Sequence, residues 1–386
     1  LYLNSFMFSS FLRVGGFWIK KACVISIVLC LISLITILAT NATANTGVVD
    51  ARAIALHAPA RFSPTDDWDE NDIIITKETP LYDVNESLYA FCFDLKNQAT
   101  EQTAYIVVSL SNDDFPIIMY SPQGVSPYYD MSTENTAVFL SAGDFYIDTG
   151  SHYTSLVNGN SIEKSELPSD VISNSAELLD NGEDFSTIRQ MYIDGTFPND
   201  NLRSVRRERN LTSVPNWQWT YGCAPTSMGM IISYHYGGSK SSILSGLAEY
   251  MSTDSHGFTT SRSTMVGAYD YLVEERGITP TTCQWASKTF LGDPRMGATY
   301  NTKSKYGSYI DAGNPVLVSV YNATDGSEEG YTGGFGDHVM TGVGYMFSDV
   351  DGDYIIVHTT HVGDGDCYIS LDSSSFAEYA WGLFEP

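Results

Sequence analysis

Basic residues are scarce in this sequence. Its 386 residues include 20 Lys and Arg against 46 Asp and Glu, which gives a formal net charge of −26. Nucleic acids and anionic membrane surfaces are themselves negative and repel such a chain. We therefore expect neither as a partner. Hydrophobic residues make up 43% of the chain, which is enough for a sizeable packed core.

Cysteine is also scarce, and no CxxC pair or Cys/His ladder with zinc spacing is present. Two of the six cysteines, Cys23 and Cys30, lie in an N-terminal apolar segment. So few cysteines in a chain of this length exclude a disulfide-stapled scaffold. The missing zinc spacing argues against a metal site, and we expect no metal or cofactor. The remaining cysteines are Cys92, Cys223, Cys283 and Cys367.

The N-terminal apolar segment has the layout of a secretory signal. Three basic residues precede the uncharged run 22–39, and the sequence Ala-Thr-Ala ends at Ala44. This order predicts a signal peptide over residues 1–44, cleavage after Ala44 and a secreted protein. An uncleaved anchor at the cell surface is the alternative, because the run is close to the minimum length for spanning a bilayer.

Two domains are predicted after the signal. In residues 45–180, β-branched and aromatic runs alternate with Asn, Asp, Gly and Pro, which predicts a small strand-rich α+β domain. It contains no clustered set of His, Cys and acid, so we expect no chemistry there. In residues 213–386, helical spacing comes first and strand patterns follow from Pro315, which predicts a second α+β domain.

Residues 181–212 join the two domains and carry an unusual cluster of basic residues. Such a segment is typical of an exposed, protease-sensitive linker between a pro-region and a mature domain. A basic patch docked on an acidic neighbour is the alternative. The cluster consists of Arg203, Arg206, Arg207 and Arg209.

Cys223 has the surroundings of a nucleophile. Gly222 permits a tight turn, and Pro225 suits the first turn of a helix, so Cys223 is predicted at a helix N-terminus. The helix dipole there favours the thiolate, which is the reactive form. Gln218 could donate a side-chain hydrogen bond to an oxyanion beside the Cys223 backbone N–H.

His338 is the best candidate for the base. It opens a predicted strand after a Gly-rich turn and is far from Cys223 in sequence, so only the fold can bring the two together. His235 lies roughly three turns along the Cys223 helix, which is too far. Two alternatives stay open. Cys223 could form a disulfide with Cys283 or Cys367, and His338 could be a structural histidine at a strand end.

Three segments in order carry a resemblance: 222–227 (GCAPTS), 313–318 (GNPVLV) and 337–345 (DHVMTGVGY). Together they resemble the bacterial C39-like cysteine peptidases of the papain-like superfamily. The resemblance implies a Cys-bearing helix packed on an antiparallel sheet that bears the His. It also implies Cys223 as nucleophile, His338 as base and a peptide or protein substrate. The N-terminal domain is similar, less closely, to the pro-regions of streptopain-like peptidases, which implies a proenzyme.

One position departs from that family. The Asp or Asn that orients the catalytic His is expected at Thr359, which carries no charge. In a serine triad, loss of this charge can cost about four orders of magnitude, although a preformed thiolate–imidazolium pair depends on it less. Asp364 or Asp366 could loop back to supply it. An inactive papain-like binding or surface module, and an acyl transferase or amidase on the same fold, therefore remain alternatives.

The acidic run from Asp349 to Asp353 resembles a calcium loop. The twelfth position from Asp349 is Thr360 instead of the Glu that an EF-hand requires. The run therefore predicts a solvated hairpin turn.

Overall fold

The computed structural model describes residues 11–14, 17–20, 47–62, 68–166, 184–197, 206–286, 298–299, 302–320, 338–373 and 379–386. The chain divides into two compact units, residues 1–50 and 51–386. In the first unit, β1 (Phe11–Val14) and β2 (Phe17–Lys20) form an antiparallel hairpin. Among the described residues, no helix has the length and apolar character needed to cross a membrane. The run 22–39 and Ala44 lie outside the described residues, so the signal stays a prediction.

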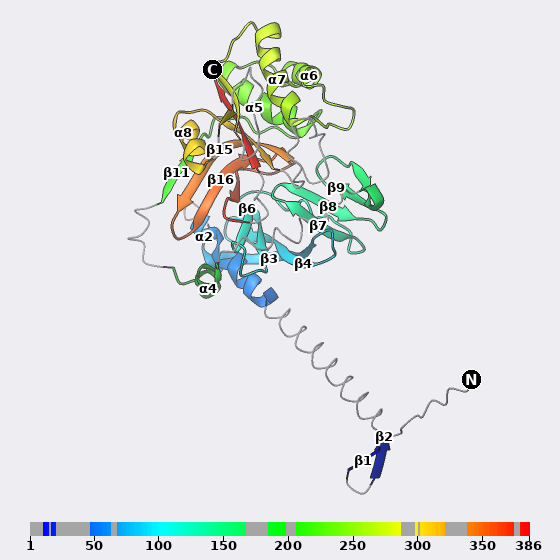
Figure 1. The fold of residues 1–386 in the computed structure, drawn as a ribbon. Helices are drawn as coiled ribbons and strands as arrows, with labels where there is room; N and C mark the ends of the chain where they lie inside the picture. The colour runs from blue at the N-terminus through cyan, green and yellow to red at the C-terminus, as the bar shows by residue number, and fades with distance from the viewer. Residues whose placement is uncertain are drawn as a thin grey trace, which may run out of the picture. The chain divides into compact units, whose positions relative to one another are not determined.

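The second unit is built on one sheet of sixteen strands, which takes strands from both halves of the chain (Figure 1). The N-terminal half supplies β3 (Ile73–Tyr82), β4 (Leu88–Asn97), β5 (Thr103–Ser109), β6 (Ile117–Ser121), β7 (Thr136–Ser141), β8 (Asp144–Asp148), β9 (His152–Ser155) and β10 (Ser161–Glu163). The C-terminal half supplies β11 (Arg207–Asn210), β12 (Thr282–Ala286), β13 (Ala298–Thr299), β14 (Val316–Val320), β15 (His338–Ser348), β16 (Gly352–His358), β17 (Cys367–Ser370) and β18 (Tyr379–Glu385).

The strand order follows from hairpins that the sequence pattern favours. The order is β10-β9-β8-β7-β3-β4-β5-β6-β17-β16-β15-β14-β18-β12-β13, and β11 pairs with β15. Strands β3 to β6 form an antiparallel meander, as do β14, β15, β16 and β17. The acidic run that begins at Asp349 is the turn between β15 and β16, which confirms the predicted hairpin turn. The turn is not fully solvated as predicted, because Asp351 is buried and pairs with Arg61.

The helices form two groups, one from each half of the chain. The first group comprises α2 (Pro59–Phe62), η1 (Glu70–Asp72), η2 (Lys164–Glu166) and α4 (Ser186–Asp194). The second comprises α5 (Cys223–Tyr236), α6 (Lys240–Tyr250), α7 (Ser261–Asp270), a π-helical turn η4 (Tyr271–Glu275) and α8 (Lys303–Asp311). Ser239, Thr260 and Thr302 cap α6, α7 and α8 by accepting a hydrogen bond from a backbone N–H in the first turn.

Helices α5, α6 and α7 gather at one end of the unit (Figure 1) and enclose its core there. Helix α5 is buried on all sides over residues 224–232, whereas α6 buries Ile243, Leu244 and Leu247 on one face. Because the first helix runs from Cys223 to Tyr236, the predicted helix after Cys223 is confirmed. The buried side chains of this core include Met228, Ile231, Ile232, Leu247, Met251, Met265 and Leu272.

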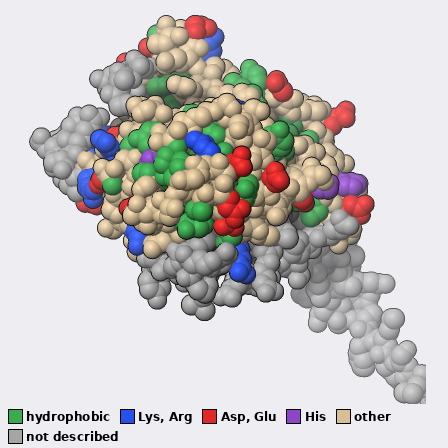
Figure 2. All heavy atoms as spheres, turned by 90° about the horizontal axis from the view of Figure 1, so that it is seen from above, with side chains coloured by type: hydrophobic (Ala, Val, Ile, Leu, Met, Phe, Trp, Pro, Cys, Tyr) green, Lys and Arg blue, Asp and Glu red, His purple; other side chains and the backbone are tan. Residues whose placement is uncertain are grey.

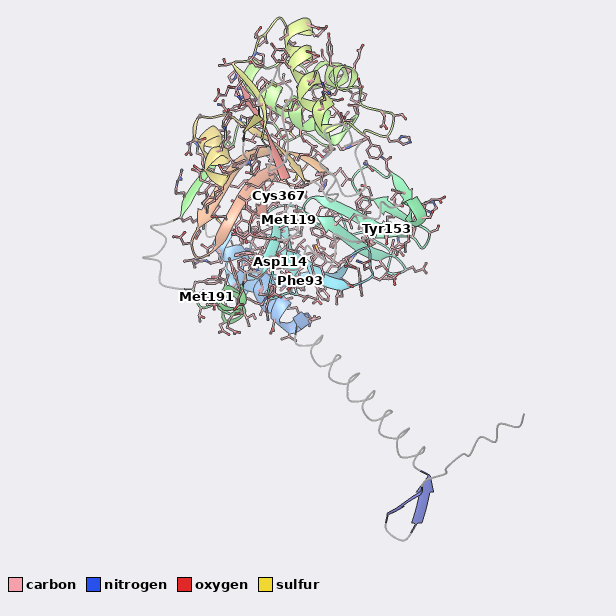
Figure 3. The ribbon with its side chains drawn as sticks, in the orientation of Figure 1. Phe93, Asp114, Met119, Tyr153, Met191 and Cys367 are labelled. Atoms are coloured by element: carbon pink, nitrogen blue, oxygen red, sulfur yellow. The ribbon has the colours of Figure 1, made fainter. Side chains whose placement is uncertain are left out.

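The two halves of the chain meet at strands β6 and β17. Tyr120 pairs with Tyr368 and Met119 with Ile369, and Figure 3 shows Met119 and Cys367 close together at this junction. The Phe62 ring from α2 packs on Tyr120 from one half, and on Tyr354 and Tyr368 from the other. The predicted limits 45–180 and 213–386 stay a prediction, but the two halves share one sheet.

Part of the predicted linker 181–212 is anchored in the fold. Strand β11 pairs with β15, so its backbone is hydrogen-bonded along Arg207–Asn210. The Arg206 guanidinium donates to the Arg61 carbonyl oxygen over 2.7 Å and to the Glu208 carboxylate over 2.8 Å. Arg203 lies outside the described residues. An exposed cleavable segment is therefore limited to residues before Arg206.

Candidate active site

Cys223 is the first residue of α5 and is partly exposed. The other three cysteines of the described residues are buried, and all four are free thiols. A disulfide from Cys223 to Cys283 or Cys367 is therefore excluded in this structure. Burial raises the pKa of Cys283 to about 12 and raises the pKa of Cys367 well above its usual value. Cys223 alone among them combines partial exposure with a helix N-terminus, where a thiolate is favoured.

The turn before Cys223 is held in an unusual backbone conformation. Tyr221 has a φ of 64°, in the left-handed region that a residue with a side chain seldom adopts. Gly222 follows, and a Cβ at this position would lie only 2.6 Å from the Gly257 carbonyl oxygen. Thr226 ties the turn to the helix, because its hydroxyl donates to the Gly222 carbonyl oxygen over 2.6 Å. The turn thus fixes the backbone of Cys223 at the start of the helix.

Two buried side-chain hydrogen bonds clamp the start of α5 to the start of β15. The Ser227 hydroxyl donates to the Val339 carbonyl oxygen over 2.9 Å, and the Thr341 hydroxyl donates to the Ser227 carbonyl oxygen over 2.9 Å. Ser227 lies one helical turn after Cys223, and Val339 follows His338. The clamps therefore hold α5, which begins at Cys223, against the start of β15, which begins at His338. The pairing of the two side chains stays a prediction.

The His338 imidazole has one defined tautomer. Its Nε2 lies 2.8 Å from the Thr359 carbonyl oxygen, and a carbonyl can only accept a hydrogen bond. Nε2 therefore carries the proton, which leaves Nδ1 as the basic nitrogen. The side chain is 4% exposed, and its pKa is lowered to about 3, chiefly by burial and next by His361. The imidazole is therefore neutral at ordinary pH in this arrangement.

Thr359 lies at the position expected for the orienting Asp or Asn, but its main chain makes the contact. Its hydroxyl instead donates to Asp364 Oδ2 over 2.7 Å. The next residue, Thr360, has a φ of 69° and accepts a hydrogen bond from the Trp219 backbone N–H over 2.8 Å. This strained peptide connects the Thr359 carbonyl to the turn that precedes Cys223.

The two aspartates considered from sequence lie in different surroundings. Asp364 is buried beside Thr359 and His361, whose Nδ1 is 3.2 Å from Asp364 Oδ2. Asp366 instead accepts hydrogen bonds from His358 Nε2 over 2.9 Å and from the Asn210 amide over 2.6 Å.

Gln218 is exposed, and its own carbonyl oxygen accepts a hydrogen bond from the Thr220 hydroxyl. Its side-chain role in an oxyanion hole stays a prediction.

The N-terminal half contributes contacts to this site that sequence reasoning missed. A Cβ placed on Gly143, in the turn between β7 and β8, would lie 3.2 Å from His338 Cδ2. The Phe145 ring packs edge-on against the His361 ring, with centroids 5.2 Å apart. The Tyr105 hydroxyl donates to Asp364 Oδ2 over 3.0 Å. No motif marks these residues, because each acts only through a contact made across the two halves.

Residues 205–385 match the model of the Peptidase_C39 like family. The C-terminal half of the chain is therefore similar to the C39-like peptidases. Cys223, His338 and Thr359 lie inside the match, whereas Tyr105 and Gly143 lie outside it. The comparison with curated proteins found no match. The family supports a hydrolase that acts on peptide bonds, and the mixed α+β architecture of the domain agrees with it.

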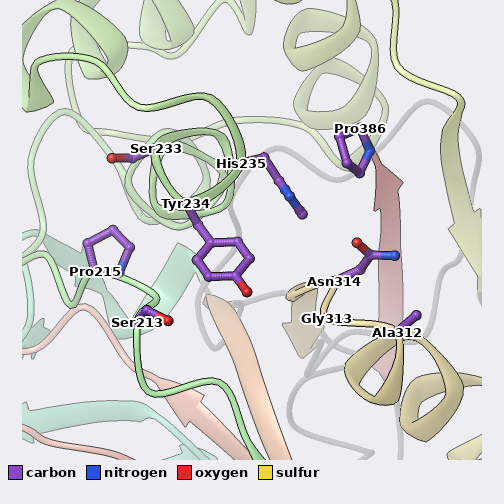
Figure 4. Close-up of a pocket in the computed structure, with 9 residues that line it drawn as sticks. All are labelled: Ser213, Pro215, Ser233, Tyr234, His235, Ala312, Gly313, Asn314 and Pro386. Carbon is purple, nitrogen blue, oxygen red and sulfur yellow. The ribbon is translucent and has the colours of Figure 1, made fainter.

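A separate pocket lies at the other end of α5 (Figure 4). Ser233 and His235, which contribute to it, are ten or more residues after Cys223, so the pocket is about 15 Å along the helix from the thiol. It is therefore distinct from the C39-like site. Its lining residues are Ser213, Pro215, Ser233, Tyr234, His235, Ala312, Gly313, Asn314 and Pro386.

Two further observations concern charge and metals. Within the described parts of the chain, no three His, Cys, Asp or Glu side chains are grouped so as to hold a metal ion. On the face drawn in Figure 2, Asp and Glu side chains lie at several separate places among other side chains. The acidic excess is therefore not gathered into one patch on that face.

Proposed function

We propose that this protein is a secreted cysteine peptidase with Cys223 as nucleophile and His338 as general base. The observation that carries the proposal is the clamp between α5 and β15 inside a C39-like domain. It holds the helix that begins at the partly exposed Cys223 against the strand that begins at His338, whose Nε2 faces the Thr359 carbonyl oxygen. The substrate is a peptide or protein, and no step needs a metal or cofactor.

The proposed reaction follows from the tautomer of His338. Nδ1 takes the proton from the Cys223 thiol, and the thiolate attacks the carbonyl carbon of the scissile peptide bond. The backbone N–H of Cys223 and the Gln218 side chain stabilise the oxyanion. The Nδ1 proton then passes to the leaving amine, which breaks the C–N bond and leaves a thioester. Water, deprotonated by Nδ1, hydrolyses the thioester to the acid and restores the thiol.

We further propose that the chain is made as a proenzyme whose N-terminal half keeps the site latent. The β7–β8 turn lies against His338 at Gly143, and the imidazole is almost completely buried. Burial lowers the pKa of His338 to about 3, which disfavours the imidazolium of a thiolate–imidazolium pair at neutral pH. Cleavage before Arg206, in the part of the predicted linker that contains Arg203, would loosen this half.

Iodoacetamide labelling from pH 4 to 8 tests the proposal, with the modified cysteine located by mass spectrometry. We expect Cys223 to be labelled well below pH 8, faster after the chain is cut between residues 198 and 205. His338→Ala should slow the labelling, and Cys223→Ser should abolish hydrolysis of a quenched peptide.

Equal, slow labelling of Cys223 in cut and uncut protein would favour a binding module instead. The buried His338 and the uncharged contact at Thr359 are the observations that support that second candidate. Products that carry an acyl group on an added amine would identify an acyl transferase.

A further inference from the structure

We propose that Asp364 is a positioning residue of this site, which supplies through Thr359 and His361 the negative charge that position 359 lacks. The inference rests on the proposed function of Cys223 and His338. Asp364 touches neither the substrate nor His338 directly. It acts on the two residues that contact the imidazole, one by a hydrogen bond and the other by ring packing.

The first connection runs through Thr359. Asp364 Oδ2 accepts the Thr359 hydroxyl hydrogen over 2.7 Å, and the Thr359 carbonyl oxygen lies 2.8 Å from His338 Nε2. A carboxylate that holds the side chain also fixes the peptide that follows it, where Thr360 has a φ of 69°. Such a conformation persists only when neighbouring contacts impose it. Asp364 thus helps to aim the carbonyl that determines the His338 tautomer.

The second connection runs through His361. Its Nδ1 is 3.2 Å from Asp364 Oδ2, and its ring lies 5.3 Å from the His338 ring, measured between centroids. His361 therefore separates the carboxylate from the catalytic imidazole.

The groups around Asp364 leave its charge largely uncompensated. Tyr105 on β5, Cys92 on β4 and Cys367 on β17 face it, and burial raises the pKa of each well above its usual value. All three are therefore neutral at working pH. His361 and His338 are the other titratable groups beside it. A buried carboxylate among neutral groups favours the charged form of a nearby imidazole.

The loop that carries Asp364 is also fastened to the segment before Cys223. The Asn216 amide donates to the Asp364 carbonyl oxygen over 2.8 Å. Two residues later, Asp366 is engaged by His358 and Asn210. Asp366 is thus a matched control: it is on the same loop, pairs with a histidine, and is not connected to His338.

The test compares Asp364→Asn with Asp366→Asn in the full chain after it has been cut between residues 198 and 205. We measure kcat/KM for a quenched peptide and the pH dependence of Cys223 labelling. Without the carboxylate the His338 imidazolium is less stable, so it stabilises the thiolate less. In Asp364→Asn, we expect the pH at which the Cys223 labelling rate falls on acidification (the acid limb) to move up by about one pH unit. We also expect kcat/KM to fall about 10- to 100-fold. Asp366→Asn should change neither quantity.

A rescue variant separates charge from folding. Thr359→Asp combined with Asp364→Asn restores a carboxylate to the same buried cluster, because the side chain at 359 contacts residue 364. We expect it to return the pH dependence of labelling towards that of the parent. The inference would be overturned if the pH dependence of Cys223 labelling were the same in Asp364→Asn and the parent. It would also be overturned if the rescue variant did not reverse the fall in kcat/KM. Absence of fast Cys223 labelling in the cut parent would instead overturn the proposed function.

Discussion

The contact between the β7–β8 turn and His338 gives the sharpest test of latency. Gly143 has a φ of 90°, and a Cβ there would lie 3.0 Å from Met340 Sδ and 3.2 Å from His338 Cδ2. Gly143→Ala therefore introduces both backbone strain and crowding at the catalytic imidazole. If the β7–β8 turn restrains the site, the substitution should favour a released state in which the turn has moved away from His338.

Gly150 provides the control. It lies between β8 and β9 with a φ of 101°, and nothing lies within 4 Å of a Cβ built there. Both alanine substitutions carry a left-handed backbone cost of about 1–2 kcal/mol. Only Gly143→Ala adds the contact with His338, which costs about 1–2 kcal/mol more when nearby atoms must shift. A difference of about 1.4 kcal/mol in favour of the released turn corresponds to a tenfold change in its population.

The assay is the rate of Cys223 alkylation at pH 6, with the free energy of unfolding measured in parallel by urea. We expect Gly143→Ala to label about tenfold faster than Gly150→Ala, at a similar or slightly lower stability. If both variants label at the parent rate while both lose stability, the β7–β8 turn does not restrain the site. The reasoning from the His338 contact would then be refuted.

Three further predictions concern acid stability, the linker and the α5–β15 clamp. The folded pKa of His338 is about 3 and its ordinary value is 6.5, so unfolding takes up a proton between these values. The free energy of unfolding should fall as the pH drops below 6.5, by about 1.4 kcal/mol per pH unit at most. In His338→Gln, the difference between the urea midpoints at pH 7 and pH 5 should be smaller than in the parent. Trypsin should cut slowly after Arg207 and Arg209, because β11 is paired with β15; rapid cleavage there in folded protein, seen by mass spectrometry, would contradict the anchored strand. Thr341→Val removes one bond of the clamp and should cost about 1 kcal/mol in urea unfolding. It should also slow Cys223 labelling, whereas an unchanged rate would show that the clamp does not align the pair.

The sequence by itself determined the local structure around the nucleophile. Gly222 and Pro225 placed Cys223 at the start of a helix, and the β-branched run around Val318 predicted β14 within the limits observed. These features depend on neighbours in sequence, such as turn conformation, helix entry and strand patterning. The ordered motifs also identified the C39-like domain, which the family match over residues 205–385 supports.

Only the tertiary structure decided how the catalytic histidine is surrounded. It assigned the Thr359 main chain to His338 and the Thr359 hydroxyl to Asp364. It also brought Tyr105 and Gly143 to the site from the N-terminal half, by joining β6 to β17 in one sheet. Such contacts depend on strand pairing between distant segments, and a single sequence does not encode that pairing in any local pattern.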